Sequence, residues 1–106
     1  MKQYIFANGI LVNTIDNRSI EEAIKLNIEV NREKASQAIT SAGLDQTTQQ
    51  NAALGIYSPE RCEAIKNYIA ACRNEYLRCK GLILAASSND DADAVQFISP
   101  SVPENL

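Results

Sequence analysis

The sequence predicts a mainly helical α+β fold: two long antiparallel helices with a short connecting helix, an N-terminal β-hairpin and a C-terminal strand. Three observations lead to this prediction. A seven-residue apolar repeat runs from Pro59 to about Ala86, a second long apolar stripe precedes it, and β-prone runs lie near both ends of the chain. With 106 residues, 45% of them hydrophobic, the chain is expected to form one globular domain.

Residues 1–13 are predicted to form the β-hairpin. Asn8-Gly9 separates two β-prone runs, and this dipeptide accommodates the two positive φ angles of a type I′ turn. A lone hairpin is barely stable in water. We therefore expect it to pack on the helices, or to pair with other strands or with the same hairpin of a second subunit.

The helical core is predicted over residues 19–86 and begins with a helix that ends at Gly43. Ser19 and Glu22 have the spacing of a capping box, and an apolar stripe follows them. Asn31 interrupts this stripe, either fixing the register of a contact between helices or facing water. The second, shorter helix is expected from Gln46 to Leu54, with Asp45 as its N-cap and Gly55 after its end.

The central helix of the core is predicted to start at Pro59, with Ser58 as its N-cap. Its apolar residues alternate at spacings of three and four, which is typical of a seam that packs against another helix. We call the following residues the inner seam: Cys62, Ile65, Ile69, Cys72, Tyr76, Cys79, Ile83 and Ala86.

A second apolar stripe lies next to the inner seam, so one long partner helix leaves part of the central helix uncovered. It consists of Ala64, Ala70, Ala71, Leu77, Leu84 and Ala85. We therefore expect an elongated molecule that forms a homo-oligomer, a dimer or higher. The predicted oligomer interface is Ile65, Ile69, Cys72, Tyr76, Cys79 and Ile83.

A basic ridge on the central helix is the candidate binding site. Lys66, Arg73 and Lys80 recur every seven residues, and Arg61 and Arg78 lie nearby. Together with Tyr68 or Tyr76, which could stack on a base, these cations could hold a small anionic ligand such as a nucleotide. The alternative is that they keep one helix face hydrated and pair with acids of the first helix or of a second subunit.

Residues 87–106 are predicted to form an acidic linker, a strand and a tail. The aspartates of 87–93 do not fit a calcium-binding EF-hand loop, because Ala94 stands where glycine is needed and Pro100 where glutamate is needed. No metal and no cofactor are predicted. Residues 94–98 have the composition of a strand, and Pro100 and Pro103 favour an extended tail.

The three cysteines are expected to be reduced and buried. Within one helix their spacings of ten and seven residues place them beyond disulfide reach, and the sequence contains no histidine to complete a metal site. Free cysteine is among the most buried residue types. Catalysis is not expected either, because histidine is absent and no serine stands in a nucleophile motif.

Charge and hydropathy narrow the expected partners and location. The net charge of −3 argues against nucleic acid and anionic membranes as partners. No apolar run approaches the roughly 20 residues needed to cross a bilayer, and the N-terminus does not resemble a signal peptide. A cytoplasmic protein is the expectation.

These observations predict a small, oligomeric, non-enzymatic binding protein: an adaptor, an inhibitor or a structural component that acts through its helical core. Its partner would be a second copy, another protein or a small anion. In outline, a small acidic chain with a hairpin and long helices resembles phage-encoded proteins that sequester bacterial defence signals. This likeness covers architecture and no shared motif, and it implies the alternative function, which is sequestration of a small anionic ligand at a subunit interface.

Overall fold

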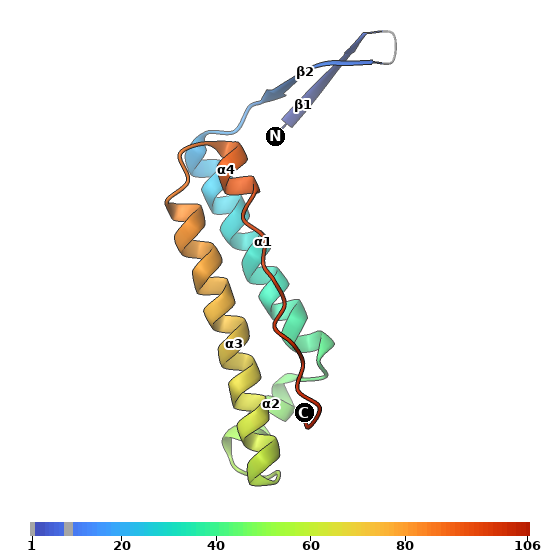
Figure 1. Ribbon diagram of the computed structural model, residues 1–106, viewed down its shortest axis with the longest axis vertical. Helices are drawn as coiled ribbons and strands as arrows, with labels where there is room; N and C mark the ends of the chain where they lie inside the picture. Colours follow the sequence, from blue (N-terminus) through green and yellow to red (C-terminus); the bar gives the residue numbers. More distant parts are fainter. Residues whose placement is uncertain (1, 8–9) are drawn as a thin grey trace.

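The computed structural model describes the backbone of residues 2–7 and 10–106, and the side chains from residue 16 onward. The two longest helices lie side by side and antiparallel, and the chain after the last helix runs back along them (Figure 1). The elements, in chain order, are β1 (Lys2–Ala7), β2 (Ile10–Asp16), α1 (Ile20–Ser41), α2 (Gln46–Ala53), α3 (Pro59–Leu84) and α4 (Asn89–Asp93).

α3 is one continuous helix of 26 residues, as the apolar repeat predicts. The Ser58 hydroxyl accepts a hydrogen bond from the Arg61 N–H at 3.2 Å, which satisfies one of the free donors of the first turn. Pro59 occupies the first helical position, where its missing N–H removes no hydrogen bond. The predicted start is confirmed, and the helix ends two residues before Ala86.

α1 and α2 also start and stop at the predicted signals. Ser19 caps α1 by accepting from the Glu22 N–H at 3.2 Å, and Asp45 caps α2 by accepting from the Thr48 N–H at 2.7 Å. Gly43 and Gly55 have φ values of 83° and 72°, the left-handed conformation that terminates helices. α2 therefore forms the corner between the two long helices.

The core consists of two apolar clusters along the contact between α1 and α3. One lies towards α2 and is built on five buried residues: Leu44, Ala52, Ile65, Tyr68 and Cys72. The other lies towards α4 and is built on four: Ala23, Cys79, Ile83 and Ala92. Phe97, from the segment after α4, packs against both clusters. The C-terminal segment, residues 95–106, therefore belongs to the helical core.

Two asparagines of α1 face α4 and the C-terminal segment. Asn27 donates to Asp93 Oδ1 at 2.8 Å, and the buried Asn31 donates to the Val95 carbonyl at 3.4 Å. Both also donate to a carbonyl one turn earlier in α1. Of the two interpretations of Asn31, the structure supports a contact between elements, made to the C-terminal segment and not to a second helix.

The predicted α+β fold class is wrong. Four helices make up 67% of residues 16–106, and the predicted C-terminal strand is not formed there. Residues 17–106 contain no strand. Residues 94–98 have a strand-like composition, but their main-chain groups bond to helix side chains and not to a neighbouring strand.

The N-terminal backbone also differs from the prediction for residues 1–13. β1 and β2 pair antiparallel with a register shift between Ile5 and Phe6, and this pairing continues to Lys2 opposite Asp16. Among the described residues the sheet has two strands, so the hairpin does not pair with a further strand of this part of the chain. The strands extend away from the helices in Figure 1, and the predicted Asn8-Gly9 turn lies outside the described residues.

The acidic stretch after α3 is a helix and not the predicted linker. Ser88 caps α4 by accepting from the Asp91 N–H at 3.0 Å, and Ala92 is fully buried against the second cluster. Aspartates in the first turn of a helix are favoured by its dipole, which explains why this acidic run is helical.

The molecule is elongated, as predicted. Its extents are 61 × 30 × 20 Å, and its radius of gyration of 18.7 Å exceeds the roughly 13 Å of a compact domain of this length. None of the described helices is both long and apolar enough to cross a membrane.

Candidate functional site

The five residues predicted to bind a ligand do not form one site. Tyr68 is buried, with 3% of its surface exposed, and its hydroxyl donates to the Ala38 carbonyl at 3.4 Å. Its ring is therefore part of the core and cannot stack on a base at the surface. Arg61 is half-buried near the start of α3, where its guanidinium lies 4.0 Å from the centre of the Tyr57 ring.

The remaining three cations, Lys66, Arg73 and Lys80, lie along the outside of α3. Lys66 and Arg73 are exposed and Lys80 is half-buried. Within residues 16–106 none of the three forms an ion pair, so the alternative that they pair with acids of α1 is not what the structure has. Successive members are about 10 Å apart along the helix axis, too far for all three to hold one small anion.

Most of the predicted oligomer interface is buried inside the chain itself. Ile65, Cys72, Cys79 and Ile83 have 0% of their surface exposed in the single chain, because α1, α2, α4 and the C-terminal segment cover them. Ile69 and Tyr76 are half-buried. The inner seam therefore has its helical partner within the chain, and the reason for expecting an oligomer through this seam is removed. An interface through Ile69 and Tyr76 remains a prediction.

The second apolar stripe of α3 is divided between two environments. Ala64 is buried and Ala71 is half-buried on the side where the C-terminal segment passes. Leu77 and Leu84 are 46% and 58% exposed. They lie on the same side of the helix as the basic ridge, because residues spaced by three and four share a face.

This uncovered side of α3 is a continuous surface in which cationic and apolar residues alternate at spacings of four and three. All of its residues except Lys80 are exposed. We call it the outer stripe: Lys66, Ala70, Arg73, Leu77, Lys80 and Leu84.

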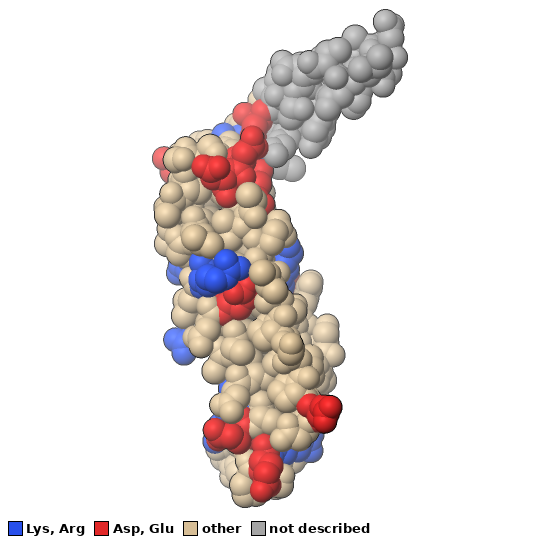
Figure 2. Space-filling model, viewed as in Figure 1, with Lys and Arg blue, Asp and Glu red and all other residues tan. Residues whose placement is uncertain are grey.

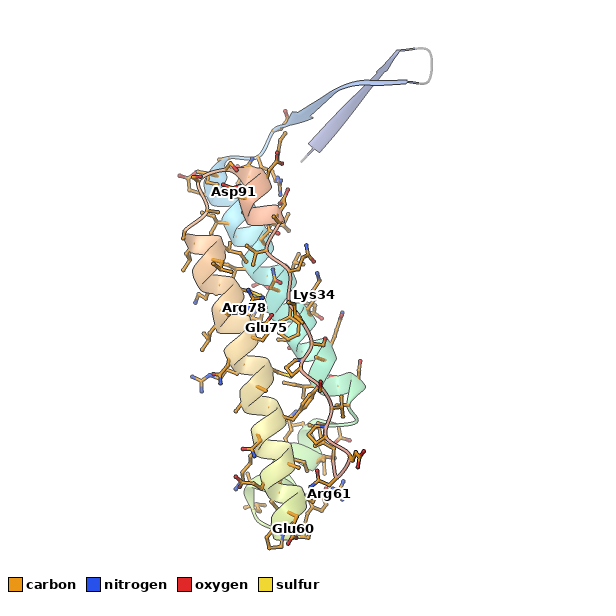
Figure 3. All side chains as sticks on the ribbon, in the orientation of Figure 1. Lys34, Glu60, Arg61, Glu75, Arg78 and Asp91 are labelled. Carbon is orange, nitrogen blue, oxygen red and sulfur yellow. The ribbon has the colours of Figure 1, made fainter. Side chains whose placement is uncertain are left out.

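A second candidate surface lies on the opposite flank of α3, where the C-terminal segment meets Glu75 and Arg78. Figure 3 shows these two side chains beside each other at mid-length of α3 and next to that segment. Arg78 donates to both carboxylate oxygens of Glu75, from Nε and Nη2, at 2.6 Å each. The pair also bonds to the passing main chain: Glu75 Oε2 accepts from the Ile98 N–H at 2.8 Å, and Arg78 Nη2 donates to the Gln96 carbonyl at 3.1 Å.

The contact between Glu75 and Arg78 favours the charged form of both side chains. The hydrogen bonds from Arg78 are the largest cause that lowers the pKa of Glu75 to about 2, with the Ile98 N–H adding to the effect. The same contact raises the pKa of Arg78. No sequence motif indicated this pair, although an acid and a base three residues apart on one helix commonly interact.

Two grooves flank residues 97–102 of the C-terminal segment. One, of about 360 Å³, is lined by Lys34, Ala38 and Tyr68 together with Phe97, Ser99 and Pro100 of the segment. The other, of about 590 Å³, lies over Ala71, Asn74 and the Glu75–Arg78 pair. The segment therefore leaves space on both sides. Sequence reasoning missed this region because its parts come from α1, α3 and the C-terminus.

A third polar group ties the start of α1 to α4. Arg18 donates to both carboxylate oxygens of Asp16, at 3.0 and 2.8 Å, and to both of Asp93, at 3.0 and 2.7 Å. These bonds lower the pKa of Asp16 and raise that of Arg18. Asp90 completes a group of three carboxylates with oxygens within 4.8 Å of one another. Because Arg18 binds two of the three, the group forms a structural ion-pair network.

Charge on the face shown in Figure 2 is distributed towards the ends. Acidic side chains gather around α4 at one end of the helical part and around the start of α3 at the other, with mixed charge between them.

The three cysteines are buried, as predicted. Burial raises the pKa of the Cys72 and Cys79 thiols.

Comparison with protein-family models, with curated proteins and with solved structures gives no match for this chain, so its function is inferred from its surfaces alone.

Proposed function

We propose that this chain is a non-enzymatic binding protein that acts through its helical core, and that the outer stripe of α3 is the surface that binds. The supporting observation is the exposure of Leu77 and Leu84, at 46% and 58%, between cations that form no ion pair within residues 16–106. Single exposed leucines are ordinary on protein surfaces. Two of them one heptad apart, with a cation before each, form a stripe of the kind that packs against another helix.

The charge of the outer stripe selects the partner. Lys66, Arg73 and Lys80 give the stripe three positive charges on a chain whose net charge is −3. Two copies packed through this stripe would place cations opposite cations, which disfavours self-association here. The partner we propose is an amphipathic helix whose apolar stripe is flanked by carboxylates.

The sequestering alternative has less support. It requires an aromatic ring beside the basic ridge, but Tyr68 is buried with its hydroxyl bonded to Ala38, and Tyr76, the other candidate, is half-buried. The ridge cations are also spread along the axis of α3, whereas a small anion is best held by donors that converge. The outer stripe suits an elongated acidic partner better than a compact one.

The test uses a synthetic acidic helix as the probe, with leucines at a and d positions and glutamates at e and g. Calorimetric titration into the full chain is expected to show binding that weakens as salt is raised from about 0.05 to 0.5 M, because the attraction is screened. Arg73→Glu should weaken binding at least about tenfold, while Lys34→Glu, on the side of the C-terminal segment, should not.

Two results would contradict the proposal. One is that titration of the synthetic acidic helix into the full chain at low salt gives no heat of binding. The other is equal binding by wild type and Arg73→Glu, because the interaction would then not involve the outer stripe. Far-UV circular dichroism of each variant establishes that the helices are retained, so a lost interaction can be assigned to the surface and not to unfolding.

A further inference from the structure

α1 carries an exposed stripe whose charge is opposite to that of the outer stripe of α3. Among the described helices, exposed large apolar side chains occur on these two alone, and those of α1 are Leu26 and Val30, at 45% and 40%. Glu22 lies one turn before Leu26 and Glu33 one turn after Val30, and both are exposed. We call these four residues the acidic stripe, since residues three and four apart share one side of a helix.

The carboxylates of the acidic stripe are not neutralised by an ion pair. Within residues 16–106 neither Glu22 nor Glu33 forms one. Glu29, the next acid on this side of α1, differs from them because it pairs with Arg32. The charges of Glu22 and Glu33 are therefore available to cations of another molecule.

The acidic stripe has the properties that the outer stripe requires of a partner, because it is an apolar strip flanked by carboxylates on a helix. Packing α1 of one copy on α3 of another covers the exposed apolar side chains of both helices and places carboxylates opposite Lys66, Arg73 and Lys80. It also avoids the contact between cations that disfavours packing of one outer stripe on another.

The two stripes lie on different flanks of the chain, which determines how copies assemble. The acidic stripe borders the C-terminal segment, because Lys34, one turn after Val30, donates to Gln96 Oε1 at 3.0 Å. The outer stripe lies on the flank of α3 away from that segment. A two-fold contact pairs the same surface of both copies, whereas here different surfaces meet. The contact is therefore head-to-tail, and it leaves one stripe of each copy free for a further copy.

Resting on the proposed function of the outer stripe, we infer that its partner is α1 of a second copy of this chain. The chain self-associates head-to-tail, with the outer stripe of one copy on the acidic stripe of the next. Each copy contributes one helix, so the contact belongs to the small, weak interfaces that bury less than about 1,200 Å². It forms at high protein concentration and low salt, and the outer stripe is uncovered in dilute solution.

Sedimentation equilibrium of the full chain measures this association. The average mass of wild type should rise between about 10 μM and about 1 mM protein, the range in which weak contacts form, and should rise less in high salt than in low salt. Glu33→Lys should weaken association at least about tenfold, because it places a cation opposite the cations of the outer stripe. Glu104→Lys makes the same change of charge at an exposed position of the C-terminal segment and should associate as wild type does.

Reversing the charge of both stripes tests whether they meet each other. Arg73→Glu alone should also weaken association at least about tenfold, whereas Arg73→Glu and Glu33→Lys in one chain should associate more tightly than either single variant, because the reversed charges attract again. Association of Glu33→Lys equal to that of wild type overturns the inference. A wild-type chain that binds the synthetic acidic helix but stays monomeric also overturns it, and this result leaves the proposed function in place.

A second measurement uses the wild-type chain and does not depend on the folding of a variant. A carbodiimide joins a lysine amine to a carboxylate in contact with it, and in an equal mixture of unlabelled and isotopically labelled chains only crosslinks between copies carry both labels. Such crosslinks are expected from Lys66 or Lys80 to Glu22 or Glu33. Mixed-label crosslinks confined to other residues, or none above those formed in high salt, overturn the inference.

Discussion

The inner seam and the outer stripe of α3 lie on one helix and share its seven-residue repeat, but they differ in what covers them. Ile83 of the seam is fully buried by α1 and α4, whereas Leu84, the next residue, is 58% exposed. The inner seam packs against other elements of the same chain. The outer stripe has the same kind of periodicity, carries cations and has no cover. An apolar repeat therefore identifies surfaces that pack, but not whether the partner belongs to the same chain.

The sharpest test of this comparison is the pair of adjacent substitutions Ile83→Ala and Leu84→Ala. Ile83→Ala leaves a cavity in the second cluster and should lower the free energy of unfolding by about 2–5 kcal/mol. Leu84→Ala removes an exposed side chain and should change it by less than about 0.5 kcal/mol. Urea denaturation followed by circular dichroism measures both values. Equal losses for the two variants would mean that an additional partner buries the outer stripe.

The second prediction concerns the flank of α3 under the C-terminal segment. The pKa of Glu75 is lowered to about 2, so its carboxylate stabilises the fold above the ordinary value of 4.5, and this contribution is lost as the pH falls from 4.5 towards 2. At pH 7, Glu75→Gln should lower the free energy of unfolding by about 1–2 kcal/mol, because charge-assisted hydrogen bonds to Arg78 and Ile98 are lost.

The pH dependence identifies the cause of that loss. The difference between wild type and Glu75→Gln should shrink as the pH approaches 2, because the wild-type carboxyl is then becoming protonated. Glu63→Gln is the matched control, since Glu63 is an exposed acid of the same helix. A difference that is constant from pH 7 to pH 2 would assign the effect of Glu75→Gln to packing and not to charge.

Local signals predicted the helices well because each boundary depends on a few adjacent residues. Ser19, Asp45 and Ser58 cap the helices that they were expected to cap, and Gly43 and Gly55 terminate two of them. The C-terminal segment was predicted wrongly because β-prone composition does not specify which groups satisfy the main chain. Here the donors and acceptors are Asn31, Glu75 and Arg78, which are distant in sequence.

The candidate sites were predicted less well for the same reason. The positions of Lys66, Arg73 and Lys80 on the outside of α3 followed from their spacing, since helical periodicity is a local property. The burial of Tyr68 depends on where α1 packs, and the Arg18 network joins residues 75 positions apart in the chain. Neither follows from periodicity alone.

Gly81 provides the last and smallest test of whether the outside of α3 is free. It is exposed, and a Cβ atom added there would have no described atom within 4 Å apart from its chain neighbours and the backbone of its own helix. Because glycine in the interior of a helix is less favourable than alanine, Gly81→Ala should raise the free energy of unfolding by about 0.5–1 kcal/mol. Gly43→Ala is the control with the opposite sign: Gly43 has a φ of 83°, which alanine adopts only with strain, so this variant should be less stable. The midpoint of thermal denaturation, measured for wild type and both variants at several protein concentrations, tests these two expected changes in stability. A loss of stability for Gly81→Ala that grows with concentration would show that a second chain packs closely against this side of α3, because only then would the added methyl group meet a neighbour.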